Sequence, residues 1–172
     1  MKIIDCTTFY SEHLMMDIRF NVLNEYVDKF IVCESTISHS GKKKKLNFDI
    51  NNYPKFKNKI SYIVIDKEPE NIIGDKNGLA EPYEKRSDSL KRINLSYDYM
   101  LNAISDASDD DYILFSDSDE IPNPKRLENF FLEKKYGIFM QKIYVYKLNI
   151  YNQYESPWEG SRICRKKNLK SF

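Results

Sequence analysis

The stretch Tyr112–Pro122, with the sequence YILFSDSDEIP, decides the expected fold and the expected site. Its four apolar residues are bounded by acidic residues and proline, which is typical of a buried strand rather than a helix. Ligands of open α/β sheets bind just beyond the carboxyl ends of strands. Asp117 and Asp119 follow this strand, and alternate residues of an extended segment point the same way. Both carboxylates are therefore expected to face one ligand.

The spacing of Asp117 and Asp119 predicts a metal site. Two hard oxygen donors suit Mg²⁺ or Mn²⁺, which usually fill their remaining positions with water and phosphate oxygens. An Asp-x-Asp pair is also common in turns, where it caps the next helix or faces solvent. The position directly after a buried strand favours the metal site, with the acidic turn as the alternative.

The composition predicts one globular domain over residues 1–172. Hydrophobic residues make up 41% of the chain and the net charge is +1, so neither a nucleic-acid protein nor an acidic tail is indicated. The run Lys42–Lys45 lacks interleaved aromatic residues, which favours a solvated loop over a nucleic-acid site. Three cysteines without metal spacing indicate reduced thiols. Without a signal peptide or an apolar stretch of membrane length, we expect a cytoplasmic protein with no membrane span.

Alternating strand and helix patterns predict an α/β fold with a mainly parallel sheet and helices on both faces. No glycine-rich dinucleotide fingerprint or P-loop is present, so a bound nucleotide must be held in another way. Two glycines and two prolines make residues 66–82 a long loop. Strands are expected at residues 2–6, 29–34, 60–65, 112–116 and, as one or two strands, 136–150; helices are expected at about 14–26, 83–105 and 123–133.

The helix expected at residues 83–105 carries an arginine on its apolar stripe. Arg86 lies one turn before the apolar residues of this stripe, Asn94 lies at its edge, and Arg92 projects to the far side. A helix start favours phosphate, and an arginine on a buried face needs an anionic partner. Arg86 and Asn94 are therefore candidates for substrate binding. The alternative for Arg86 is a side chain that snorkels at the helix end.

Several ordered blocks of the sequence resemble one family. They are DCTTFY at 5–10, VDKFIVCES at 27–35, HSGK at 39–42, DYILFSDSDEIP at 111–122, YVY at 144–146 and the loop WEGS at 158–161. In these blocks the chain resembles glycosyltransferase family 17, the β-1,4-N-acetylglucosaminyltransferases that include the enzyme adding bisecting GlcNAc to N-glycans. The resemblance implies a Rossmann-like GT-A fold, a UDP-sugar donor such as UDP-GlcNAc, a divalent cation, a glycan acceptor and inversion at the anomeric carbon.

The resemblance also implies roles for individual residues. Asp119, with Asp117, would hold the cation, and Glu159 would act as base beside Trp158, which would stack on a sugar; Glu120 is the second candidate base. The alternatives are an ordinary loop glutamate for Glu159 and a contact to the following helix for Glu120.

Two residues in the first strands complete the expected donor site. Thr7 is a further substrate-binding candidate. Glu34 ends the second strand and would contact the uridine ribose, or instead pair with a lysine of the run 42–45.

Family members usually continue past the position of Phe172 with a segment that carries a Trp-His motif. The resemblance therefore implies that part of the donor site lies outside this sequence. Two other readings of the function stay open. One is a nucleotidyltransferase-like metal enzyme that prefers a nucleoside triphosphate, and the other is a non-catalytic binder of nucleotide sugars.

Overall fold

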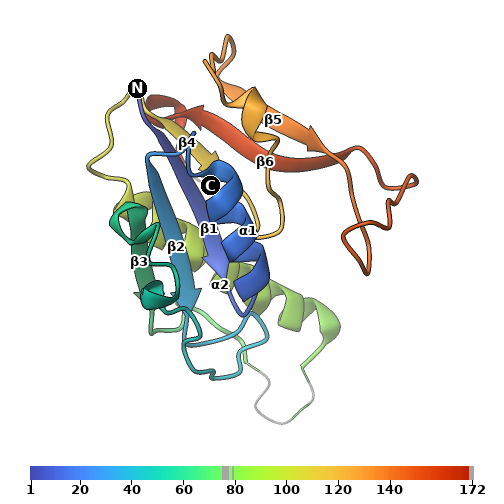
Figure 1. The fold of residues 1–172 in the computed structure, drawn as a ribbon. Helices are drawn as coiled ribbons and strands as arrows, with labels where there is room; N and C mark the ends of the chain where they lie inside the picture. Colours follow the sequence, from blue (N-terminus) through green and yellow to red (C-terminus); the bar gives the residue numbers. More distant parts are fainter. Residues whose placement is uncertain (75–77, 79, 171–172) are drawn as a thin grey trace.

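The computed structural model describes residues 1–74, 78 and 80–170, and it contains one six-stranded mixed sheet and two α-helices (Figure 1). The strand order is β3-β2-β1-β4-β6-β5, in which β3, β2, β1 and β4 are mutually parallel and β6 runs antiparallel to both of its neighbours. The strands are β1 Ile3–Phe9, β2 Lys29–Ser35, β3 Ile60–Ile65, β4 Tyr112–Phe115, β5 Tyr136–Gln141 and β6 Trp158–Arg165; the helices are α1 His13–Leu23 and α2 Pro82–Ala103.

The helices lie on opposite faces of the sheet, and the apolar side chains of the central strands alternate between them (Figure 1). On one face, Phe20 of α1 is fully buried against Phe30 of β2. On the other face, Met100 of α2 belongs to the cluster that contains Ile31 and Ile113. This arrangement confirms the predicted α/β fold with helices on both faces. Neither helix in the described ranges is long and apolar enough to cross a bilayer.

The order of the strands creates a switch point between β1 and β4. From β1 the chain passes through α1 to β2 and then to β3, on one side of β1. It then returns through α2 to β4, on the other side of β1. Connections that leave a parallel sheet in opposite directions open a crevice at the carboxyl ends of the two strands. The acidic loop after β4 lies at this crevice.

Two predicted elements are wrong, and the one or two strands expected at 136–150 are shorter, since only Tyr136–Gln141 forms a strand there. The segment 123–133 contains only a single 3₁₀ turn, Pro124–Arg126, although the Asn123 side chain caps its start. Asn129 adopts a positive φ of 51°, which is not compatible with a right-handed helix. The WEGS block at 158–161 is not a loop but the start of β6, which lies between β4 and β5. Its charged residues obscure the strand pattern in the sequence, and its two neighbouring strands supply the pairing. The described residues of the predicted loop, 66–74, 78 and 80–82, contain no strand, and residues 75–77 and 79 lie outside the described part.

Candidate active site

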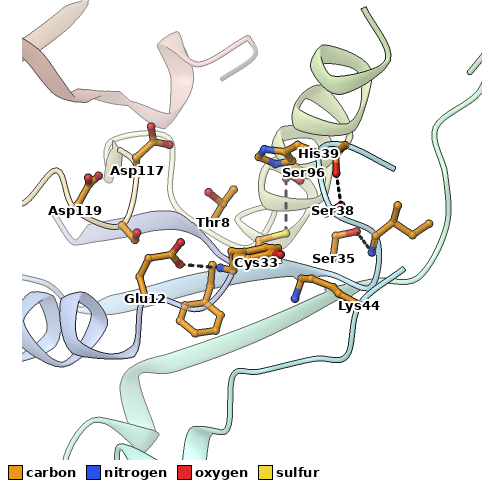
Figure 2. Close-up of a pocket in the computed structure, with 15 residues that line it drawn as sticks. Thr8, Glu12, Cys33, Ser35, Ser38, His39, Lys44, Ser96, Asp117 and Asp119 are labelled. Carbon is orange, nitrogen blue, oxygen red and sulfur yellow. Dashed lines mark hydrogen bonds between the residues drawn. The ribbon is translucent and has the colours of Figure 1, made fainter. Parts of the chain in front are cut away.

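A cleft of about 590 Å³ lies at the carboxyl ends of β1 and β2, and Asp117 and Asp119 both line it (Figure 2). Both aspartates are exposed, whereas Ser118 between them is buried, as expected for alternating side chains. Figure 2 shows the aspartates at one end of the cleft, with Ser38 and Lys44 toward the other. Hydroxyl groups are common in the lining, which includes Thr8, Ser35, Ser38, Ser40 and Ser96.

The wall formed by residues 36–48 is tied to the sheet by Glu34, whose side chain is completely buried. One carboxylate oxygen accepts hydrogen bonds from Lys44 Nζ and from the backbone N of Asn47, at 2.8 Å for Asn47. The other accepts from the backbone N of Phe48 at 3.0 Å and from the Tyr62 hydroxyl at 2.7 Å. Two oxygens with two bonds each have no acceptor capacity left. Glu34 therefore anchors the wall and is not positioned to contact a ribose.

These contacts control the charge of Glu34 and of the lysine run. Burial alone would raise the pKa of Glu34, but the hydrogen bonds from Lys44, Asn47, Phe48 and Tyr62 outweigh it and lower this pKa below its ordinary value. The positive charge of Lys44 is thereby paired with Glu34, and its Nζ also lies 5.1 Å from the centre of the Tyr10 ring. The run 42–45 is therefore not a uniform cationic surface.

The arginine of α2 that contacts the cleft wall is Arg92, not Arg86. Arg92 forms a salt bridge with Glu68 at 2.8 Å and donates to the backbone oxygen of His39 at 3.1 Å. Gly41 lies against its guanidinium, since a Cβ there would be 2.8 Å from Nη2, and its φ is +84°. Arg86 is exposed and lies outside the lining, so its predicted place on the buried face is wrong. The prediction took Leu90 as part of the buried stripe, but Leu90 is 49% exposed. The first turns of α2 carry no buried apolar residue, so an apolar side chain there does not mark the buried face.

A second cleft of about 560 Å³ shares Asp117 and Asp119 with the first. Its walls come from β5, from the start of β6 and from the long hairpin loop between them, which Figure 1 shows extending away from the helices. Trp158 lines it and donates from Nε1 to Glu120 Oε1 at 2.6 Å. Tyr144, Tyr146, Lys142 and Glu155 are also among its lining residues.

Besides Glu34 and Arg86, three further predicted site residues do not line either cleft. Glu159 is exposed and follows Trp158 in β6, so its side chain points to the opposite face of the strand. Thr7 is 1% exposed and donates to the backbone oxygen of Thr8, and it is Thr8 that lines the first cleft. Asn94 is exposed on α2, whereas Ser96 of the same helix lines the cleft.

The loop after β4 has the electrostatics of a cation site. Desolvation in the cleft raises the pKa of Asp117, and the neighbouring carboxylates of Glu120 and Asp119 raise it further, while His39 and Arg162 oppose the shift. A divalent cation would relieve this repulsion, and the two exposed aspartates are the hard oxygen donors it prefers. Within the described ranges no group of three or more His, Cys, Asp and Glu side chains could hold a metal. The pair therefore fits an ion whose other ligands are water and substrate oxygens.

The buried Arg19 of α1 was not predicted to take part in the site, although it lies directly behind the acidic loop. It forms a buried ion pair with Asp5 of β1 at 2.6 Å and donates to the backbone oxygens of Asp117 and Glu120, each at 3.1 Å. Arg19 lies among apolar positions of α1, between Met16 and Leu23. A charge on the buried face of a helix was the available signal, because such a charge needs partners.

The fold and the site together define the class of this chain. An α/β sheet with an aspartate pair at its switch point, between two clefts, is the arrangement expected of a Rossmann-like glycosyltransferase. The sequence profile of the family described as Glycosyltransferase family 17 matches residues 1–167, and the chain belongs to this family.

Individual proteins with glycosyltransferase names are also similar to this chain. The chain is similar to the proteins named beta-1,4-mannosyl-glycoprotein 4-beta-N-acetylglucosaminyltransferase of Rattus norvegicus and Homo sapiens. Each is 26% identical to it over 125 residues, and the match covers 70% of this chain and 22% of each relative.

Proposed function

We propose that this chain carries the donor site of a metal-dependent glycosyltransferase that transfers GlcNAc from UDP-GlcNAc to a glycan acceptor with inversion. The observation that carries the proposal is the position of Asp117 and Asp119 between two clefts. The first cleft, at the carboxyl ends of β1 and β2, takes the nucleotide. The second, with Trp158 and Tyr144 in its wall, takes the acceptor, because aromatic faces suit the apolar face of a sugar ring.

Asp117 and Asp119 would hold Mn²⁺ or Mg²⁺. The bound ion supplies Lewis-acid stabilisation of the departing diphosphate. The hydroxyl-rich lining of the first cleft, including Thr8 and Ser35, offers hydrogen bonds to the nucleoside. These side chains stand on the sheet and on a wall anchored by Glu34, so the donor is oriented without large rearrangement.

Glu120 takes the role of base in this proposal. It lines the acceptor cleft next to the aspartate pair, and the indole N–H of Trp158 orients its carboxylate. A base on the acceptor side would take the proton of the acceptor hydroxyl, whose oxygen attacks the anomeric carbon from the face opposite the leaving diphosphate, which is the geometry of inversion. Glu155 is the other glutamate in the lining of this cleft, in the connection between β5 and β6.

A fluorescence titration tests the donor site, because Trp158 is the single tryptophan of the sequence. Its hydrogen bond to Glu120 places it beside the proposed cation, and paramagnetic Mn²⁺ should quench it. We expect UDP and UDP-GlcNAc to bind with Mn²⁺ and not in EDTA, and Asp119→Asn to weaken binding at least tenfold, or about 1.4 kcal/mol. The matched control is Asp98→Asn, on the exposed face of α2. Equal UDP affinity in EDTA and Mn²⁺, or a preference for ATP over UDP, would refute the proposal.

A further inference from the structure

We propose that Arg19 is a positioning residue that sets the geometry of the metal-binding loop from behind the sheet. The inference rests on the proposed function, since it concerns the cation that Asp117 and Asp119 would hold. Arg19 does not touch substrate or cation. It acts through the Ser116 hydroxyl and the backbone carbonyls of Asp117 and Glu120, and it is completely buried.

All five N–H groups of the Arg19 guanidinium have an acceptor. Nε and one Nη2 proton go to the two oxygens of Asp5, at 2.7 and 2.6 Å. The second Nη2 proton goes to the Ser116 hydroxyl at 2.6 Å. Both Nη1 protons go to loop carbonyls, one to Asp117 and one to Glu120, each at 3.1 Å. The guanidinium donor inventory is therefore complete, with three of its five bonds ending on the loop.

This division shows that the ion pair with Asp5 does more than satisfy a buried charge. Asp5 alone neutralises Arg19 and receives two of its bonds, which also locks the plane of the guanidinium. The locked plane then presents three donors to a loop that crowds three carboxylates into four residues, 117–120. With the carbonyls of Asp117 and Glu120 held inward, the Asp117 and Asp119 side chains face the clefts.

A second anchor reinforces one end of the loop. The Ser161 hydroxyl of β6 donates to the same Glu120 carbonyl at 2.8 Å, so this oxygen accepts from both Arg19 and Ser161. The Asp117 carbonyl accepts from Arg19 but not from Ser161. Its other bond, from the Glu120 amide at 3.1 Å, lies within the loop itself. Loss of Arg19 should therefore disturb Asp117 more than Glu120.

Lysine in place of Arg19 is the decisive variant. Lysine keeps the charge for Asp5 but has three donors on one nitrogen and cannot form the planar fork. We expect Arg19→Lys to weaken Mn²⁺ binding in the presence of UDP at least tenfold, measured by quenching of Trp158. The control is Met16→Ala, which removes a fully buried apolar side chain of the same helix that donates no hydrogen bond to the loop. It should lower the melting temperature by at least as much and leave Mn²⁺ affinity within twofold.

Hydrogen exchange of the amides of residues 117–120 separates this inference from the proposed function. In Arg19→Lys these amides should exchange at least tenfold faster than in Met16→Ala, whether or not Mn²⁺ is present. If wild type binds no Mn²⁺, the proposed function fails while this measurement still decides the role of Arg19. Unchanged exchange and affinity in Arg19→Lys, or equal losses in Met16→Ala, would overturn the inference. Should Arg19→Lys not fold, Ser116→Ala, which removes one of the three loop bonds, should show the same pattern at two- to fivefold, and no effect there would also overturn it.

Discussion

Replacing Glu34 by Gln tests whether this carboxylate anchors the wall of the donor cleft. Each carboxylate oxygen accepts two hydrogen bonds, and the amide group of Gln would place a donor against one of these pairs. Two bonds to a charged acceptor are lost, and each contributes about 1.5–3 kcal/mol, so the free energy of unfolding should fall by about 3–6 kcal/mol. For a chain of this size, roughly 2–4 °C per kcal/mol predicts a fall in Tm of at least about 6 °C.

Urea unfolding and calorimetry measure this effect, with Glu25→Gln on the exposed end of the α1 segment as control. The pH dependence gives a second readout. Because the pKa of folded Glu34 lies below its unfolded value of about 4.3, its ionised form stabilises the protein above that pH. This contribution disappears as pH falls through the lower folded pKa, so the gap between wild type and Glu34→Gln should close below about pH 4. A gap that stays constant from pH 7 to 3, or an equal loss in Glu25→Gln, would refute the reasoning.

Three further outcomes follow from the same wall and core. Gly41→Ala should lower stability by about 1–2 kcal/mol, because its φ of +84° disfavours a Cβ and Arg92 blocks the space; an unchanged Tm would contradict this. Arg92→Ala should reduce both UDP affinity and stability, whereas exposed Arg86→Ala should change stability by less than about 0.5 kcal/mol, and equal effects would mean that the wall does not depend on Arg92. Burial and the nearby Glu34 raise the pKa of Cys33 to about 12, so Ellman's reagent should react with the three buried thiols only after denaturation, and rapid labelling of the native protein would count against the packing.

Local patterns in the sequence were enough to predict the four parallel strands of the sheet. The run Tyr112–Phe115 and the parallel strands β1 to β3 are short apolar segments whose pattern depends on burial alone, and the structure confirms each of them. The acidic residues after β4 could be located for the same reason, since a strand end in a parallel sheet is also an edge of the crevice. The resemblance to glycosyltransferase family 17 rested on such contiguous blocks, and the family match confirms it.

The predictions that failed depend on contacts between distant segments. The apolar periodicity shows the buried face of a helix only where that helix packs against the core, and the first turns of α2 do not pack. The prediction therefore placed Arg86 on the inner face and Arg92 on the outer face, whereas Arg92 contacts the cleft wall. The sequence around Glu34 offered two partners, and only the fold shows that its four bonds all end within the protein.

Pairing across the sheet decided the remaining features. β6 is a strand because β4 and β5 lie on either side of it, which places Trp158 in the second cleft and Glu159 on the other face. Composition, the positions of the parallel strands and the aspartate pair can thus be read along the chain, because they depend on residues close in sequence. The anchoring of the acidic loop by Arg19 depends on atoms nearly a hundred residues apart, so only the tertiary structure could establish it.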